Sequence, residues 1–246
     1  MNGSARVMLA LLAFSTGAGA DAGNARTGAS KAEAILAASK RATGAAAWDK
    51  PQGCFEEGTH ADGAIHYRTR FSLVAYGMRV DSDRSGRTRA MGFNGVSSWL
   101  ATGDGKVDVR SDPVSLRDGI VTNYLSVNGF FFPDRFPATF RYLRKAREAG
   151  KKFDVIEVAP EGGRSFEAWF DVRRHLIRRV VDNKAVPPIT VEADDYRKVG
   201  DYTIAFKLNI FGPDGAVADR GAVTSFYCGP IESSIFDPPV VPRFVQ

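Results

Sequence analysis

Histidine is scarce in this chain, and the motifs that build catalytic sites around histidine or serine are missing. The three histidines are His60, His66 and His175, none lies in an HExxH zinc pattern, and no GxSxG turn occurs. His60 and His66 flank Asp62, but six residues apart on one strand they would lie far from each other, which is typical of surface histidines rather than of a metal site. We therefore expect no metal, no cofactor and no enzymatic activity.

Acidic residues arranged as a catalytic pair are also lacking. Asp194 with Asp195, and Glu56 with Glu57, are sequence neighbours in extended segments. Adjacent strand residues point to opposite faces, so these neighbours make poor acid and base partners. The GGR at 162–164 lacks the strand-to-helix context of a phosphate loop and indicates a hairpin turn. An unrecognised hydrolase is the least supported class.

Cysteine occurs at only two positions, Cys54 near the first predicted strand and Cys228 near the last. In an exported chain two cysteines are more often paired than free, which predicts a disulfide between them. A bridge over so long a loop would stabilise the fold by up to about 5 kcal/mol in the chain-entropy model. The alternative is two buried thiols.

A hydrophobic run of membrane-spanning length is not expected either, because the apolar run from Val7 to Phe14 is too short to cross a bilayer. Arg6 precedes this run and small residues follow it, which is the layout of a secretory signal. Cleavage could follow Ala20 or Ala22, and we take 1–22 as the expected signal peptide. We expect a mature protein that is soluble and either periplasmic or secreted.

The excess of positive charge is small, because 33 Lys and Arg against 28 Asp and Glu leave a net charge of +5. Basic residues gather in Arg141 to Lys152 and in Arg173 to Arg179. They could contact an anionic membrane surface or acidic ligand groups. Alternatively they are solvated strand edges and turns, where Lys and Arg deter edge pairing. No nucleic-acid partner is expected of an exported chain of this kind.

Aromatic residues are plentiful, with 17 Phe, 7 Tyr and 3 Trp, which suits strands. Between Phe153 and Phe211 apolar and polar residues alternate in five runs separated by turn residues, which predicts five strands. Ile65 to Leu73 alternates in the same way and has a basic outer face. The apolar, proline-broken segment 130–138 predicts a buried loop or aromatic plug.

Two segments have helical signals. Ser30 and Glu33 have capping-box spacing and predict a helix that ends at Gly44. Asp112 before Pro113 predicts a second helix that ends at residues 128–129. The segment from Phe140 to Arg147 stays open between strand and helix, because its propensity and its alternation disagree.

The chain divides into four segments on these patterns. We expect the signal peptide at 1–22, a flexible leader at 23–29, one folded domain at 30–230 and an extended proline-rich tail at 231–246.

Several motifs carry a resemblance to known proteins. WFDVRRHLIRRVV and DYRKVGDYTIAFKLNIF, with the order of helices and strands, resemble the LolA/LolB-like superfamily of periplasmic lipoprotein carriers and receptors. More closely, AILAASKRATGAAAW, GFNGVSSW, NGFFFPDRFPATFRYL, FDVIEVAPEGGRSFEAWFD and DYRKVGDY resemble the N-terminal region of exported bacterial proteins that carry a retroviral-type aspartyl protease domain. The likeness covers Ala32 to Ile210. This chain has no DTG or DSG triplet, so the peptidase activity is not carried over.

The resemblance implies a mainly β fold with helices (α+β), an incomplete antiparallel β-barrel or half-barrel closed by helices, with an apolar cavity in the carrier members. It also favours the strand at Phe140 to Arg147. We chose the residues expected to line the cavity by strand face alone. They are Phe71, Trp99, Phe166, Phe170, Ile204 and Phe206.

The function hypothesis that follows is an exported, non-enzymatic protein. It would bind a hydrophobic ligand, such as an acyl chain, a lipid or a lipoprotein, in that cavity, in a carrier-like role that the resemblance associates with the outer membrane. The alternative is a ligand-free module that docks onto a partner protein.

Overall fold

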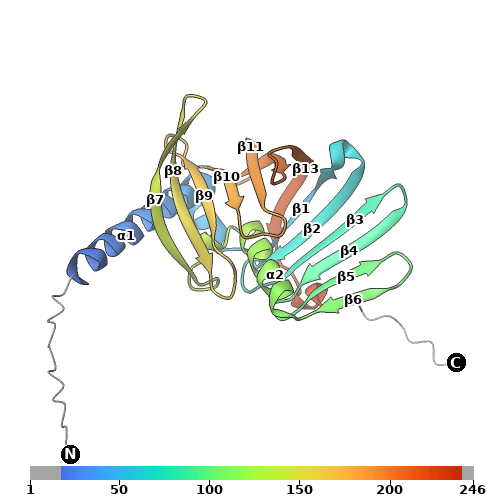
Figure 1. Cartoon of the computed structure of the whole chain (residues 1–246). Coiled ribbons are helices and arrows are strands. Elements are labelled where there is room, and N and C mark those ends of the chain that lie inside the picture. The colour runs from blue at the N-terminus through green and yellow to red at the C-terminus, as the bar shows by residue number, and fades with distance from the viewer. Residues whose placement is uncertain (1–17, 240–246) are drawn as a thin grey trace, which may run out of the picture.

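Thirteen antiparallel strands form one sheet within residues 18–239, the part of the chain that this computed structural model describes (Figure 1). Side chains are described from residue 27 onward. The strands are β1 (Gly53–His60), β2 (Ile65–Ser72), β3 (Met78–Arg84), β4 (Arg87–Phe93), β5 (Ser98–Thr102), β6 (Val107–Arg110), β7 (Ala138–Glu148), β8 (Lys151–Pro160), β9 (Phe166–Asp171), β10 (Ile177–Asp182), β11 (Ile189–Val199), β12 (Tyr202–Phe211) and β13 (Val217–Gly229). The five strands expected between Phe153 and Phe211 are confirmed as β8 to β12.

The sheet consists of two meanders joined at its centre. Its strand order is β6-β5-β4-β3-β2-β1-β13-β12-β11-β10-β9-β8-β7, so β6 and β7 are free edges and the barrel stays open. β1 pairs with β13, where Cys54 lies directly opposite Cys228. The two cysteines form the predicted disulfide, with Cα atoms 4.0 Å apart. The half-barrel fold class is confirmed.

Two α-helices, α1 (Ala18–Thr43) and α2 (Pro113–Ser126), accompany the sheet. The second starts as the sequence predicts, because the Asp112 side chain accepts hydrogen bonds from the backbone N–H groups of Val114 and Ser115, each at 3.1 Å. The chain must pass from the β6 edge to the β7 edge, and it does so through α2 and the short 3-10 helix η3 (Gly129–Phe131). Figure 1 shows α2 lying across the opening of the half-barrel.

The first helix is longer than expected. It begins at Ala18, so it includes 23–29, which the sequence predicted to be a flexible leader. Ser30 is inside the helix rather than at its start, and its hydroxyl donates to the carbonyl of Thr27 at 3.1 Å. The capping-box prediction at Ser30 is therefore wrong. Most of the predicted signal peptide, 1–17, lies outside the described residues.

The ambiguous segment is a strand, as the resemblance favoured. Phe140 to Arg147 belongs to β7, which pairs with β8 along its whole length. Ala149 and Gly150 turn the chain between the two strands with φ values of 46° and 76°. The positive φ explains why glycine suits the second turn position.

The core lies on one face of the sheet, which we call the inner face. Phe71, Met78 and Phe93 are directly opposed on β2, β3 and β4 and therefore share this face. Helix α2 packs closely on it, because a Cβ built at Gly119 would lie 2.6 Å from the ring of Phe93. Within the described chain the buried cluster also includes aromatic residues from the crossing segment: Phe130, Phe131, Phe132 and Phe136. The predicted aromatic plug is confirmed.

The described part of the C-terminal segment packs on the opposite, outer face. It contains a 3-10 helix, η4 (Ser233–Phe236), and Phe236 is buried. The Trp99 indole N–H donates to the Phe236 carbonyl at 2.7 Å, and the Asn94 side chain donates to Asp237 at 2.9 Å. Residues 231–239 are thus a packed strap with one helical turn rather than a fully extended tail, while 240–246 lie outside the described residues.

Neither α1 nor α2, the α-helices in the described residues, combines the length and the apolar character needed to cross a membrane.

Candidate functional site

Most of the predicted cavity residues lie together, but inside a filled core. Phe71, Phe166 and Phe170 belong to the buried cluster on the inner face, and Ile204 packs against it. Phe206 follows on the same side of β12, where the Arg197 guanidinium lies 4.6 Å above its ring. These five side chains face the concave side, as the strand alternation predicts.

Trp99 lies on the other face. It is paired with Gly92 on β4, one position away from Phe93 and Ser98, which face α2. Its ring instead contacts Gly92 and lies 5.6 Å from the Arg79 guanidinium. The expectation that Trp99 converges with the other cavity residues is therefore corrected, because the turn at 94–97 places Ser98 opposite Phe93, so Ser98 and not Trp99 faces inward.

The plug occupies the centre of the half-barrel. Phe131 and Trp48 approach with ring centroids 6.1 Å apart, and Phe130 and Phe170 with centroids 5.9 Å apart. The Lys40 ammonium and the Arg135 guanidinium donate to the carbonyls of Phe131 and Leu73 at 3.1 and 2.8 Å. The half-barrel is thus packed with its own aromatic side chains at this level.

An open groove remains beside the plug, between α2 and strands β3 to β6. Its volume is about 510 Å³, within the usual range of ligand pockets. The residues that line it are Met78, Met91, Gly92, Phe93, Ser98, Trp99, Leu100, Asp108, Arg110, Ser115, Asp118, Gly119 and Thr122. We call it the inner groove.

The floor of the inner groove is apolar and open to solvent. Met91 and Leu100 are directly opposed on β4 and β5 and retain 47% and 36% of their surface exposed. Ser115 and Thr122 of α2 line the opposite side. Asp108 pairs with Arg110 at 2.7 Å at one rim, so these two charges are already neutralised. Such a groove suits an apolar chain more than an ionic ligand.

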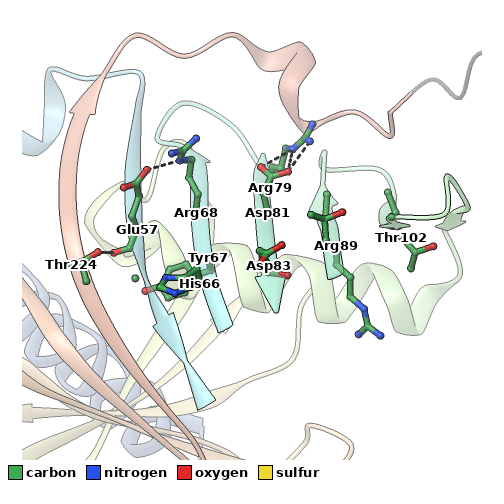
Figure 2. A pocket seen from close by; sticks show the side chains of 16 residues that line it. Glu57, His66, Tyr67, Arg68, Arg79, Asp81, Asp83, Arg89, Thr102 and Thr224 are labelled. Carbon is green, nitrogen blue, oxygen red and sulfur yellow. Dashed lines mark hydrogen bonds and ion pairs between the residues drawn. The ribbon is translucent and has the colours of Figure 1, made fainter. Parts of the chain in front are cut away.

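A second hollow, of about 570 Å³, lies on the outer face over β13 and β1 to β5 and is polar (Figure 2). Glu57 and Arg68 face each other across β1 and β2 at 2.5 Å. Asp81 accepts hydrogen bonds from Arg70 and from Arg79, the latter at 2.8 Å. Burial acts to raise the pKa of Asp81, but the two guanidinium groups outweigh it and hold the pKa below its usual range. Glu57 and Arg68 thus form a cross-strand pair, whereas Asp81 is paired both across to β2 and along β3.

A half-buried carboxyl group, that of Glu56, lies on the inner face of β1. The Tyr67 hydroxyl donates to Glu56 at 2.8 Å, and the rings of Tyr67 and His60 lie tilted to each other with centroids 4.6 Å apart. His60 Nδ1 lies 2.9 Å from a carboxylate oxygen of Asp219. Burial raises the pKa of Glu56, and the bond from Tyr67 offsets this only in part. A carboxyl group that favours its neutral form is compatible with an apolar face.

The described residues contain no cluster of three or more histidine, cysteine, aspartate or glutamate side chains that could hold a metal ion. His66 is exposed, as predicted, whereas His60 is half-buried and engaged with Tyr67 and Asp219.

The fold has counterparts among solved structures. A putative outer membrane lipoprotein-sorting protein domain from Vibrio parahaemolyticus matches with a TM-score of 0.57 and 13% identity, over 85% of this chain and 97% of that one. A DUF1329 family protein from Desulfovibrio piger has the same TM-score and 12% identity, over 84% and 97%. A LolA superfamily protein from Nitrosomonas europaea matches with a TM-score of 0.55 and 12% identity, over 84% and 97%.

This chain has a LolA/LolB-like fold. At such low identity the likeness concerns the fold alone. No family model matches the sequence, and no curated protein matches it. The likeness to proteins with an aspartyl protease domain stays a prediction.

The residues that sequence reasoning missed are those of the inner groove, above all Met91 and Leu100. The signal for them is weak, because Met91 lies between Ala90 and Gly92, and Leu100 directly follows Trp99, which itself was expected to face the cavity. Only the register of β4 against β5 brings them together.

Proposed function

We propose that this protein binds an acyl chain or similar lipid tail in the inner groove, as a non-enzymatic carrier. The observation that supports this is the exposed apolar floor of Met91 and Leu100 in a groove of about 510 Å³ on the concave side of a half-barrel. Monomeric proteins rarely leave contiguous apolar surface open without a binding role. Two of the solved proteins with this fold are described as a lipoprotein-sorting domain and a LolA superfamily protein, which is consistent with the proposal.

The energetics are adequate for such a ligand. Each methylene that leaves water contributes about 0.8 kcal/mol before ordering costs, so a chain of ordinary length reaches micromolar affinity without an ionic contact. The predicted cavity residues Phe71, Phe166 and Phe170 would then support the groove from the core rather than touch the ligand. Ile204 and Phe206, on β12, lie outside the lining of the inner groove and would likewise not touch the ligand.

Export belongs to the proposal as well. The disulfide is typical of an oxidising compartment, and the sequence of 1–22 has the layout of a signal peptide. We therefore propose a periplasmic or secreted protein.

Titration with a fluorescent fatty acid tests the carrier function. Wild-type protein should bind it saturably, and Leu100→Asp should weaken binding at least tenfold, because the charge must be desolvated against the apolar floor. Val109→Asp is the matched control, since Val109 lies on the neighbouring strand, faces outward and is 51% exposed. It should leave the affinity unchanged. An equal loss of fatty-acid affinity in both variants would argue against the inner groove as the binding site.

The second candidate is a ligand-free module that docks onto a partner protein. The observation that favours it is the plug, which fills the centre of the half-barrel with Phe130, Phe131 and Phe136. If wild-type protein shows no saturable binding of the fatty acid or of a lipopeptide, the docking module replaces the carrier.

A further inference from the structure

Two turns at one end of the molecule carry basic side chains that the fold does not use. The β7–β8 hairpin brings Arg147 opposite Lys152, next to Lys151. The β9–β10 turn, with Arg173 and Arg174, lies beside this hairpin, because the backbone N–H of Val172 donates to the carbonyl of Lys152 at 3.0 Å. We call these five cations the basic tip. Figure 1 shows the β7–β8 hairpin reaching beyond its neighbouring strands.

The basic tip differs from the other arginines nearby, which are paired. Arg178 bonds Asp194 at 2.7 Å, and Arg179 bonds both Glu148 and Glu192 at 2.7 and 2.5 Å. All five tip side chains are exposed, and none of them has a hydrogen bond or ion pair to another part of the described chain.

The local charge balance keeps the tip positive. The segments 145–154 and 171–179 together hold eight basic and three acidic residues, and Asp194 and Glu192, the partners of Arg178 and Arg179, bring the acidic residues to five. Of the acidic ones, Asp171 turns its carboxylate to the backbone N–H groups of Arg173 and Arg174, each at 2.8 Å. This bond shapes the turn so that both guanidinium groups stay in solvent.

We propose that the basic tip docks onto a bilayer surface that carries anionic lipid headgroups. A surface of diffuse negative charge suits cations spread over two turns. A protein partner would be expected to meet an apolar or aromatic centre, since the cores of protein interfaces are depleted in charge. The large exposed apolar residues of the described chain all lie elsewhere, for example Val96, Val186 and Tyr227. The two hollows do not include any tip residue either. This inference does not depend on the carrier proposal.

Vesicle cosedimentation tests the docking. The full mature chain is mixed with vesicles of phosphatidylcholine alone, or of phosphatidylcholine with an equal part of phosphatidylglycerol. We expect binding to the anionic vesicles at low ionic strength and none to the neutral ones. Binding should disappear near 1 M salt, where the screening length falls to about 3 Å.

The variant R147Q/K151Q/K152Q removes three cations from the tip. Because each cation near an anionic surface contributes about a fivefold factor in affinity, the variant should bind roughly 100-fold more weakly. The matched control is R84Q/R87Q/R89Q, which removes the same charge from the β3–β4 hairpin, where these arginines are also exposed and without ion pairs in the described chain. Its affinity for anionic vesicles should stay within about threefold of wild type, because a lower net charge weakens the long-range attraction only slightly.

Two results would overturn the proposal. One is an equal loss in the control, which would mean that net charge alone drives adsorption. The other is that wild-type protein does not bind anionic vesicles at low ionic strength. The partner of the basic tip would then be an acidic protein. Thermal midpoints of both variants should match wild type, since no pairing contact is removed.

Discussion

Glu56, on the inner face, should set part of the pH dependence of the free energy of unfolding. Burial raises its pKa above the ordinary value of 4.5 in the folded protein. Above that pH the folded state binds more protons than the unfolded state, so this group's contribution to stability is present below about pH 4.5 and is lost as pH rises through the folded pKa. Glu56→Gln cannot ionise. It should be more stable than wild type at pH 7, by an amount that vanishes towards pH 4, in urea unfolding across that range.

Tyr67 provides the opposite change at the same site. Its hydroxyl favours the charged form of Glu56, so Tyr67→Phe should steepen the loss of stability between pH 4.5 and 7. A stability difference between Glu56→Gln and wild type that is the same at both ends of the range would contradict this account.

The sequence correctly indicated that Glu56 and Glu57 face opposite ways. It did not indicate which of them lies on the inner face, because that depends on the pairing with β13, far along the chain.

The second helix depends on a close approach to the sheet. A Cβ at Gly119 would lie 2.6 Å from Phe93 and 2.8 Å from the Ser98 hydroxyl. Gly119→Ala should therefore push α2 away from β4 and β5 and cost about 1–3 kcal/mol of unfolding free energy, more than the roughly 1 kcal/mol that helix propensity returns. Chemical denaturation measures this, and fatty-acid affinity should change with it, because Gly119 lines the inner groove.

Gly28 is the matched control in the first helix. A Cβ there meets nothing within 4 Å, so Gly28→Ala should stabilise the protein by about 0.5–1 kcal/mol. If both substitutions stabilise, α2 is not packed as tightly as the geometry indicates.

Local signals predicted the start of α2 but not that of α1, and alternation predicted β8 to β12 but not β3. The α2 cap needs only Asp112 and Pro113, which are adjacent in sequence. Strand β3 has no clear signal of its own in the sequence, because Asp81 and Asp83 are charged. Arg70 and Arg79 neutralise Asp81 across and along the strands, and this makes a polar strand stable at that place. Such ion pairs follow from register, which a single strand does not reveal.

For the molecule as a whole, the half-barrel was predictable only through family resemblance, and the place of the open groove was not predictable. The chain has to cross from the β6 edge to the β7 edge. Its crossing segment carries Phe130 to Phe136 across the inner face of the half-barrel, where they join the core. The sequence indicated a plug and a cavity separately. The structure brings both to the same face, so that the free volume moves aside to the inner groove.

The disulfide joins the two meanders of the sheet and should govern the stability of the whole. It links Cys54 on β1 to Cys228 on β13, closing a loop of 174 residues. A double Cys54→Ser, Cys228→Ser variant should lose about 2–5 kcal/mol of unfolding free energy, because the unfolded chain regains the entropy that the bridge removes. The fold should remain, since the backbone pairing on both sides of the bridge continues without it. Urea unfolding with and without reductant measures the effect: the wild type should shift to the variant's midpoint on reduction, and the variant should not respond. A wild-type midpoint that reductant leaves unchanged would mean that β1 and β13 hold the two meanders together through pairing and packing alone.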